Sequence, residues 1–366
     1  MSEVIPGPDL FLEDRPLIDV RAPTEFFKGS FPAATNLPLL IDEERHQVGV
    51  SYKEEGQAAA INLGNRLVSG DTKVERIEGW KAFIEANTNP ALFCFRGGLR
   101  SKTSQQWLVE HGLDIPIVRG GYKAMRRFLI DETEAVLGNL SVIVLAGRTG
   151  SAKTALLKRF NDDVGSGCID LEGLANHRGS AFGKRIEAQP SQIDFEHRIA
   201  IDLIRHARSS SETLIIEDES RLIGRCALPV ALQQMIQKSP IVMIEATLAE
   251  RVNHSWENYI LSNYQSHCRV ATSPEAGFES FATSLRESLS NISKRLGGKR
   301  YKDLSAKLEQ AISAHQHGDN EQHKIWIEEL LRDYYDPMYD YQQTVKTRDT
   351  LFRGTFTETL DFLINR

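Results

Sequence analysis

The chain has little cysteine, no long apolar run and no strong excess of charge of either sign. Its four cysteines stand singly at positions 94, 168, 226 and 268, which excludes a disulfide framework and a CxxC metal site. The apolar run 142–146 is far shorter than the roughly 18 residues of a membrane span. The first residues carry acids and prolines where a secretion signal needs a basic stretch and then an apolar one. We therefore expect a cytoplasmic protein with reduced thiols and no structural metal site.

Size and composition indicate an ordinary globular protein of two or three domains. The chain has 366 residues, of which 41% are hydrophobic and 26% charged, which excludes a disordered, collagen-like or coiled-coil protein. The formal net charge is −6, so contact with nucleic acid would depend on local basic patches.

Alternating apolar runs and amphipathic stretches predict two α/β domains, each with a parallel sheet. In the first, strands are expected at 17–20, 91–95 and 115–121, and helices at 75–88 and 99–112. A polar stretch at 131–140 marks a boundary. In the second, strands are expected at 141–147, 168–173, 213–220 and 240–247. Amphipathic segments from residue 273 predict a helical C-terminal tail that packs on the second domain. The predicted domains are 1–132, 133–272 and 273–366.

A thiol stands in a glycine- and arginine-rich loop between an expected strand and an expected helix. Backbone N–H groups of such a loop, together with the helix N-terminus, favour anions. This setting lowers a thiol pKa and favours a thiolate nucleophile beside an oxyanion pocket. A small buried hydrophobe at a strand end is the common alternative for a lone cysteine. The predicted catalytic residues are Cys94, Arg96 and Arg100, and the predicted oxyanion loop adds Gly97, Gly98 and Ser101.

Residues 17–39, LIDVRAPTEFFKGSFPAATNLPL, resemble the opening motif of rhodanese-type sulfurtransferases. Cys94 falls where their persulfide-forming cysteine lies. The resemblance implies a rhodanese-like domain in which Asp19 and Arg21 are structural. The cysteine loop is one residue longer than the common sulfurtransferase form. It reads C-x5-R-S, the spacing of cysteine-dependent phosphatases, whose longer loop encircles a tetrahedral phosphate-like group.

Residues 147–154, GRTGSAKT, have the strand–loop–helix context of a phosphate-binding P-loop. Lys153 would supply a point charge, and the Thr154 hydroxyl would ligate Mg²⁺. The usual pattern has glycine at the position of Ala152. This departure makes ordinary nucleotide hydrolysis less certain. We therefore predict a P-loop NTPase-like domain. Its expected diphosphate-binding residues are Gly147, Gly150, Ser151, Lys153 and Thr154.

Acidic residues at the ends of two expected strands are candidates for a Mg²⁺-binding or acid role. Glu217 and Asp218 end one strand, and Asp170 and Glu172 follow another as weaker candidates. The three successive acids 217–219 are equally typical of a solvated strand end.

Long motifs over nearly the whole chain resemble those of bacterial tRNA 2-selenouridine synthases. They are CFRGGLRS in the cysteine loop, RGGYKAMRRF (119–128), DLEGLANHRGSAFG (170–183), QPSQIDFE (189–196), EDESRLIGR (217–225) and YYDPMYDYQ (334–342). The resemblance implies an enzyme that acts on modified 2-thiouridine at the wobble position of a few tRNAs. It also implies S-geranylation with geranyl diphosphate, and then exchange of the S-geranyl group for selenium from selenophosphate.

Both loops fit that chemistry. Selenophosphate is a phosphate-sized oxyanion that suits the arginine-lined cysteine loop. We expect the Cys94 thiolate to attack selenium and phosphate to leave, so that an S-selanylcysteine carries the selenium forward. The P-loop would hold and neutralise a departing diphosphate. His177 and Arg178 are candidates for contacting the diphosphate or the RNA, with a surface turn as the equal alternative. The aromatic and acidic segment 334–342 is expected primarily to pack the tail and secondarily to contribute to a site.

Two basic stretches are candidates for the tRNA interface. Residues 93–129 contain seven basic residues against two acidic ones, and residues 294–302 contain five basic residues and no acid. Tyr122 and Tyr301 lie within them and could stack on unpaired bases. A solvated helix face is the common alternative. The predicted tRNA-binding residues are Arg119, Lys123, Arg126, Arg127, Lys299 and Arg300.

Other functions stay open from the residues alone. The C-x5-R-S loop is also typical of a rhodanese-fold phosphatase, although the sequence offers no identifiable general acid. A P-loop kinase or ATPase with a sulfur-sensing module is a second alternative. A plain persulfide carrier for tRNA thiolation is a third, and it leaves the P-loop unexplained. The oligomeric state is open, and a monomer is plausible.

Overall fold

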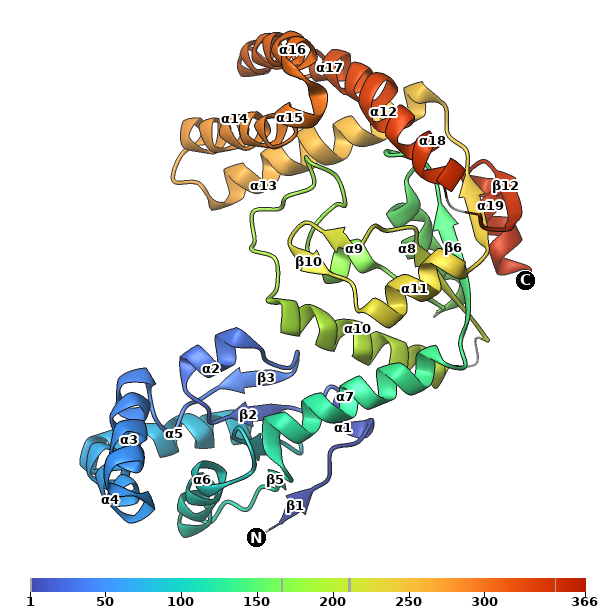
Figure 1. Ribbon diagram of the computed structural model, residues 1–366. Coiled ribbons are helices and arrows are strands. Elements are labelled where there is room, and N and C mark those ends of the chain that lie inside the picture. Colours follow the sequence, from blue (N-terminus) through green and yellow to red (C-terminus); the bar gives the residue numbers. More distant parts are fainter. Residues whose placement is uncertain (1, 166, 210–211, 346) are drawn as a thin grey trace. The chain divides into compact units, whose positions relative to one another are not determined.

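Short strands, the central ones apolar on both sides, form two five-stranded sheets in the computed structural model, and all neighbouring strands in them are parallel. The structure describes residues 2–165, 167–209, 212–345 and 347–366. The chain divides into two units (Figure 1). The first holds the chain up to Gly138 together with Ser191–Arg205, and the second holds Asn139–Pro190 and His206–Arg366. The predicted α/β class with parallel sheets is confirmed.

The sheet of the first unit has the order β1-β5-β4-β2-β3. Its strands are β1 (Glu3–Val4), β2 (Leu17–Asp19), β3 (Ala34–Asn36), β4 (Ala91–Phe93) and β5 (Ile117–Val118). The helices of this unit are α1 (Asp9–Leu12), α2 (Pro23–Lys28), α3 (Asp42–Glu55), α4 (Gln57–Leu67), α5 (Gly70–Ala86), α6 (Leu99–Glu110), α7 (Gly121–Leu137) and α10 (Gln192–Ala207).

Helices cover both faces of this sheet, and its three central strands, β2, β4 and β5, are buried on both sides. One apolar cluster joins Leu17 and Phe93 of the sheet to residues of α1, α7 and α10. A second cluster joins Ile18 and Leu92 to residues of α3, α4, α5 and α6, including the fully buried Trp80. Burial of both faces explains why these strands are continuous apolar runs without polar alternation.

Helix α10 belongs to the first unit, although the sequence suggested that residues 133–272 form one domain. Asp194 accepts a hydrogen bond of 2.6 Å from the Ser30 backbone N–H. The His197 ring stacks on Phe31 at a centroid distance of 4.5 Å. The apolar face of α10 joins the core of the first unit through Ile201 and its neighbours. These contacts lie far apart in the sequence, which is why local patterns did not indicate them.

The sheet of the second unit has the order β12-β11-β6-β8-β7, and a separate antiparallel pair joins β9 to β10. The strands are β6 (Ser141–Ala146), β7 (Cys168–Ile169), β8 (Thr213–Glu217), β9 (Leu222–Ile223), β10 (Cys226–Ala227), β11 (Ile241–Ile244) and β12 (Thr350–Gly354). The first helices are α8 (Lys153–Val164), α9 (Leu171–Leu174) and α11 (Val230–Lys238).

A largely helical region follows β11. It contains α12 (Leu248–Trp256), the π-helix η1 (Glu257–Ser262), α13 (Asn263–Val270), α14 (Pro274–Asn291), α15 (Ser293–Leu296), α16 (Gly298–Gln316), α17 (His323–Leu330), the π-helix η2 (Leu331–Tyr335), α18 (Asp336–Val345) and α19 (Phe356–Ile364). Phe281 and Trp326 lie at the centre of its own apolar core. None of the helices in the described part of the chain is long and apolar enough to cross a membrane.

The C-terminal residues do not form only the helical tail expected from residue 273. Strand β12 pairs with β11 at the edge of the second sheet. Leu360 and Leu363 of α19 pack with Leu156 of α8. One short strand of five residues, mostly exposed, gave no clear period-two signal in the sequence.

A buried ion pair connects the residues before β12 to the end of β8. Arg348 donates to both carboxylate oxygens of Asp218 at 3.0 and 2.7 Å, and the two side chains are 1% and 3% exposed. Such a pair is costly to break from one side, because the remaining charge is left buried without a partner.

We expect Arg348→Met to lower the free energy of unfolding by about 3–5 kcal/mol, measured by denaturant titration. The double variant Asp218→Asn/Arg348→Met should recover part of the loss, since no unpaired charge remains. Arg353→Met is the matched control, because Arg353 pairs with Glu245 on the surface, where both side chains are more than half exposed. Equal losses in Arg348→Met and Arg353→Met would contradict this account.

Candidate functional site

The cysteine loop, residues 94–101, leads from β4 into the N-terminus of α6. Gly97 adopts a left-handed backbone with φ of +65°. Gly121 at the start of α7 packs so closely that a Cβ there would overlap the Cys94 carbonyl oxygen. The backbone N–H groups of Tyr122 and Lys123 donate to the carbonyls of Cys94 and Phe95 at 2.9 and 3.0 Å. The conformation of the loop therefore depends on the glycines of the segment 119–123.

Cys94 is buried, and its Sγ lies 3.2 Å from the Ser101 hydroxyl. Burial by itself raises the pKa of this thiol, but hydrogen bonds from the Ser101 side chain and from the backbone of Arg96 and Ser101, with the charge of Arg100, lower the pKa below its usual value. When the Cys94 thiol is neutral, the Ser101 hydroxyl can donate to the Gly98 carbonyl, 3.1 Å away. When the thiol ionises, the hydroxyl can turn and donate to the sulfur.

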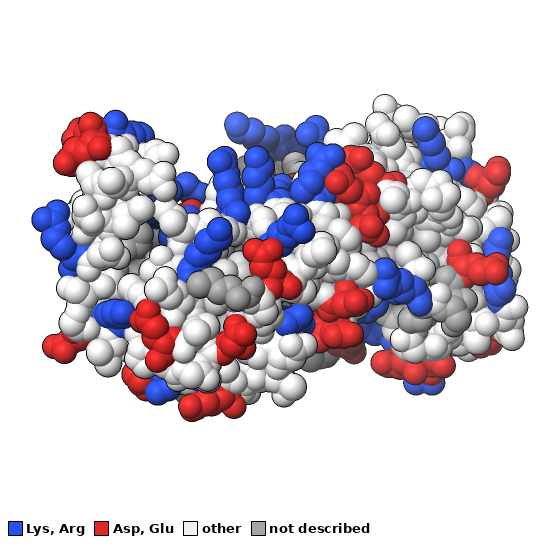
Figure 2. All heavy atoms as spheres, turned by 90° about the horizontal axis from the view of Figure 1, so that it is seen from below, with Lys and Arg blue, Asp and Glu red and all other residues white. Residues whose placement is uncertain are grey.

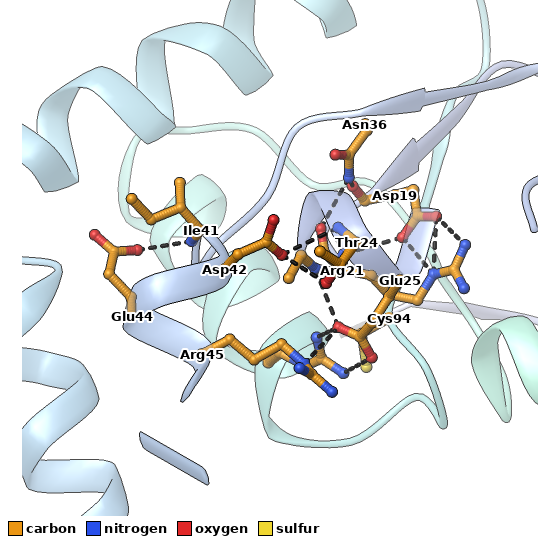
Figure 3. Close-up of polar contacts among 12 residues, drawn as sticks. Asp19, Arg21, Thr24, Glu25, Asn36, Ile41, Asp42, Glu44, Arg45 and Cys94 are labelled. Atoms are coloured by element: carbon orange, nitrogen blue, oxygen red, sulfur yellow. Dashed lines mark hydrogen bonds and ion pairs between the residues drawn. The ribbon is translucent and has the colours of Figure 1, made fainter. Parts of the chain in front are cut away.

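Of the two predicted arginines, only Arg100 is held in place. It donates to both carboxylate oxygens of Glu25 at 2.6 and 3.1 Å, and Arg45 lies 3.1 Å from the same carboxylate (Figure 3). Arg96 is exposed and lies over the ring of Phe95. Arg100 is thus positioned beside the loop, whereas Arg96 is available to a ligand that approaches from solvent.

Asp19 and Arg21 form a buried ion pair of 2.6 Å beside the same site (Figure 3). Arg21 also donates to the Gly29 carbonyl at 2.8 Å and lies 3.9 Å from the centre of the Tyr122 ring. These contacts tie β2 to the segment before β3. They correct the expectation that Tyr122 stacks on an RNA base, because Tyr122 is 6% exposed and already packed.

Cys94 opens onto a cavity of about 1340 Å³ lined by α3, α4, α6 and the cysteine loop. Several exposed apolar side chains stand on its wall. They are Val50 (39% exposed), Tyr52 (58%), Ile61 (39%), Phe95 (36%) and Leu99 (51%). Several exposed apolar side chains around one cavity are typical of a binding site for an apolar ligand.

The lysine loop, residues 147–154, leads from β6 into α8. Gly150 has φ of +84°, and a Cβ there would lie 2.8 Å from the Arg251 carbonyl oxygen. Lys153 donates to the Gly147 carbonyl at 3.1 Å. Ala152 also takes the left-handed conformation, with φ of 63°, which costs an alanine about 1–2 kcal/mol. The fold thus imposes on Ala152 a backbone conformation that glycine adopts without this cost.

Two of the predicted carboxylates meet at Thr154. Its hydroxyl lies 2.7 Å from Glu217 Oε1 and 3.2 Å from Glu172 Oε2. Burial, followed by repulsion from Glu172, raises the pKa of Glu217 well above its usual value. Burial likewise raises the pKa of Glu219 to about 8. This cluster differs from a solvated strand end, since Glu217 is fully buried.

The other two predicted carboxylates do not contact the Thr154 hydroxyl, although Asp218 lines the cavity of the lysine loop. Asp218 is occupied by Arg348, and Asp170 accepts a hydrogen bond of 2.7 Å from the Gly173 N–H at the start of α9. Among the described residues, no three His, Cys, Asp or Glu side chains could hold a metal ion by themselves.

The segment 334–342 both packs and lines the second site. Arg251 donates to both oxygens of Asp336 at 2.7 Å, and Arg148 of the lysine loop donates to Asp340 at 2.7 Å. A cavity of about 340 Å³ extends from the lysine loop, and its wall includes Tyr335, Met338, Tyr339 and Gln342 of this segment. Arg178 lines it too and is fixed by Asn263 at 2.7 Å, whereas His177 is not among its lining residues.

The predicted tRNA-binding residues are accessible to different degrees. Arg119 and Lys123 are exposed, and Lys123 lines the large cavity. Arg126 pairs with Glu196, and Arg127 pairs with Asp131. Lys299 and Arg300 are exposed at the start of α16, where Tyr301 packs against the helical core. Figure 2 shows acidic and basic side chains interspersed on much of one face, with one group of adjacent basic side chains.

The sequence did not single out Glu25, Arg251 or Asp336. Glu25 positions the predicted Arg100, and Arg251, held by Asp336, donates to the Thr149 carbonyl of the lysine loop. Glu25 lies 75 positions from Arg100, and Arg251 lies 85 positions from Asp336. Glu25 lies within the motif 17–39 and Asp336 within the segment 334–342, so the motifs included these residues without indicating their partners.

Comparison with known proteins gives consistent matches. Residues 140–366 match the family described as "tRNA 2-selenouridine synthase AAA domain". A protein named tRNA 2-selenouridine synthase from Hahella chejuensis is 50% identical over 97% of this chain and 92% of its own length. Proteins of the same name from Alcanivorax borkumensis and Marinobacter nauticus are 48% and 49% identical, over 98% and 94% of this chain and 97% and 93% of their own lengths.

We expect Ser101→Ala to raise the pKa of Cys94, since it removes the side-chain hydrogen bond that stabilises the thiolate. The midpoint of the pH dependence of Cys94 alkylation should move to higher pH, and the rate at neutral pH should fall. Ser104→Ala is the matched control, because Ser104 lies on the same helix, is equally buried and bonds only the Arg100 carbonyl. The expectation fails if both variants keep the wild-type midpoint.

Proposed function

The chain belongs to the tRNA 2-selenouridine synthase family and is an enzyme of that type, and from this premise we propose that it exchanges the sulfur of a wobble 2-thiouridine in tRNA for selenium in two steps. The first is S-geranylation with geranyl diphosphate at the lysine loop. The second is replacement of the S-geranyl group by selenium from selenophosphate at the cysteine loop. The observation that carries this proposal is the presence of two different anion-binding loops, only one of which has a nucleophile.

The lysine loop suits a reaction in which diphosphate leaves. Lys153, Arg178 and the backbone N–H groups at the start of α8 line one cavity and would neutralise the departing diphosphate. The apolar chain would lie toward the wall formed by Met338 and the tyrosines. Alkylation needs the departing diphosphate to be stabilised. Unlike nucleotide hydrolysis, it needs no attack on a terminal phosphate.

Mg²⁺ fits this site as a companion of the diphosphate. Magnesium is usually held by one or two carboxylates together with substrate phosphates. Glu217 and Glu172, with the Thr154 hydroxyl between them, offer such a donor set. Bound Mg²⁺ would supply additional positive charge to the leaving diphosphate.

The cysteine loop suits the selenation step. Its anion-binding backbone, Arg100 and the Cys94 thiolate are appropriate for selenophosphate, and the sequence suggests an S-selanylcysteine as the intermediate. The apolar wall of the adjoining cavity would hold the ten-carbon chain of the geranylated base. Basic residues on the same cavity, including Lys28, Lys53 and Lys123, are suited to phosphates of the tRNA.

The two loops should control separate steps. Lys153→Ala should lower S-geranylation of 2-thiouridine tRNA by about 100-fold or more, yet still convert pre-geranylated tRNA to 2-selenouridine. Cys94→Ser should do the reverse and accumulate S-geranyl tRNA. Chromatography of nucleosides after digestion measures both products.

Arg159→Ala is the control for Lys153→Ala, since Arg159 lies on the same helix and pairs with Asp163 on the surface. If both loop variants stop at 2-thiouridine, the division of work is wrong. Release of phosphate from ATP or from a phosphate monoester at rates that exceed tRNA selenation would instead favour the ATPase or the phosphatase alternative.

Filling the apolar cavity should impair only the second step. A Cβ at Gly49, on the cavity wall, meets no atom within 4 Å. We therefore expect Gly49→Leu to reduce kcat/KM for S-geranyl tRNA by about tenfold or more, mainly through KM, since its side chain would take the space of the hydrocarbon chain. Gly79→Leu is the control, a helical glycine with equal free space away from the cavity. Equal kinetics of both variants would show that the chain binds elsewhere.

A further inference from the structure

Tyrosine rings form part of the wall of the cavity beside the lysine loop. Tyr335 of η2 and Tyr339 of α18 line this cavity, and so does Tyr259 of η1. Each of the two π-helices in the described part of the chain thus contributes a tyrosine to it. A π-helical turn interrupts the regular hydrogen bonding of a helix and is frequent at functional sites. This placement suggests that the rings take part in the reaction of the cavity.

The hydroxyl groups of two of these tyrosines are engaged by the protein itself. The Tyr335 hydroxyl accepts a hydrogen bond of 3.2 Å from the Ala181 backbone N–H. The Tyr339 hydroxyl donates to Met243 Sδ at 3.5 Å. These contacts hold both rings in place, so what the two side chains offer to a ligand is mainly their aromatic surface.

Tyr339 lies beside the loop that is expected to hold the diphosphate. Its phenol is close to the Gly147 backbone N–H and to the charge of Arg148, which both belong to the lysine loop. Tyr339 and Lys153 line the same cavity. The first carbon of geranyl diphosphate is bonded directly to a diphosphate oxygen. When the diphosphate occupies the loop, this carbon therefore lies within reach of the tyrosine wall.

We propose that these tyrosine rings stabilise an allylic cation, so that geranyl diphosphate ionises at the lysine loop before the sulfur of 2-thiouridine attacks. This inference deepens the proposed function and rests on it, because it takes geranyl diphosphate as the substrate of the lysine loop. The electron-rich face of an aromatic ring attracts a cation, and the attraction is strongest where water is excluded.

Each step balances in atoms and electrons. The bond between C1 of the geranyl chain and the diphosphate oxygen breaks, and its electron pair leaves with the diphosphate. The positive charge is shared by C1 and C3. A lone pair of the thiocarbonyl sulfur then forms the C1–S bond, and N3 of the base loses its proton to water. The reaction is a substitution and needs no oxidant or reductant.

Different groups stabilise the two charges that form. Lys153 and Arg178 line the cavity and would stabilise the diphosphate anion. The allylic fragment is left next to the neutral rings. A carboxylate could capture the cation as an ester, but Glu172 and Glu217 are engaged at the Thr154 hydroxyl.

The phenols stay neutral in this cavity. Burial raises the pKa of Tyr259 to about 12, and it also raises the pKa of Tyr335 and of Tyr339 above the usual value. A phenolate would be alkylated by the cation, whereas a neutral phenol is a poor nucleophile. The cation therefore persists until the sulfur reaches it.

A fluorinated substrate tests the order of bond breaking on the wild-type chain. Fluorine at C2 of geranyl diphosphate destabilises the cation but leaves the size of the substrate nearly unchanged. At saturating substrate, we expect 2-fluorogeranyl diphosphate to alkylate 2-thiouridine tRNA about 100-fold or more slowly than geranyl diphosphate in a single turnover. A rate within about threefold of that of geranyl diphosphate would overturn the inference, since the sulfur would then attack before positive charge develops.

Variants at Tyr339 test the ring. Tyr339→Leu should lower kcat for S-geranylation by about 10- to 30-fold with little change in KM for geranyl diphosphate, because the ring acts on the cation and not on the bound substrate. Tyr339→Phe keeps the ring and should lose much less. Tyr341→Leu is the matched control, because Tyr341 lies on the same helix, is 70% exposed and does not line the cavity. Equal kcat in Tyr339→Leu and Tyr341→Leu, or a change in KM alone, would contradict the role of the ring.

Two reference reactions separate the outcomes. Tyr339→Leu should still convert pre-geranylated tRNA to 2-selenouridine, which shows that the variant is folded, and the fluorinated substrate on the wild-type chain decides in any case. If the wild-type chain S-geranylates tRNA but uses the fluorinated substrate nearly as fast, the inference is wrong and the proposed function stands. If it makes no S-geranyl tRNA from geranyl diphosphate, the proposed function fails, and the inference fails with it.

Discussion

Both candidate sites depend on one feature of parallel sheets. Where a strand ends in a tight loop, the loop residues lie at the N-terminus of the following helix. The arrangement occurs from β4 to α6 and from β6 to α8. In each case unpaired backbone N–H groups and the helix dipole create positive potential without a metal. The remaining structure holds these loops in shape. Gly121 and the Tyr122 backbone fix the cysteine loop, and Arg251 fixes the lysine loop.

Buried charge is used at both sites to orient groups that do not themselves react. Asp19 holds Arg21, which lies against Tyr122 near the cysteine loop, and Glu25 holds Arg100 beside it. Asp336 holds Arg251 at the second site. Such pairs contribute little net stability, because desolvation offsets their attraction, yet they define side-chain positions closely. That precision is what an anion site needs, since its donors must face oxygens of fixed geometry.

The difference between the sites follows from what each loop carries. The cysteine loop presents a thiolate whose pKa is lowered by its neighbours. The lysine loop presents a cation and, at Thr154, a hydroxyl engaged by two carboxylates. In the proposed function, the first provides a nucleophile beside an oxyanion pocket, and the second stabilises a diphosphate that leaves.

Sequence patterns alone determined the α/β class, both loops and most of their residues, because each depends on short-range order of an apolar strand, a glycine-rich turn and a helix start. Tertiary structure alone decided what touches these loops. It assigned α10 to the first unit, paired Asp218 with Arg348, buried Tyr122 and placed β12 at the sheet edge. These features join residues far apart in the chain, through contacts that burial makes favourable and that no local pattern records. The left-handed backbone at Ala152 belongs to the same class, because the fold imposes it against the preference of the residue.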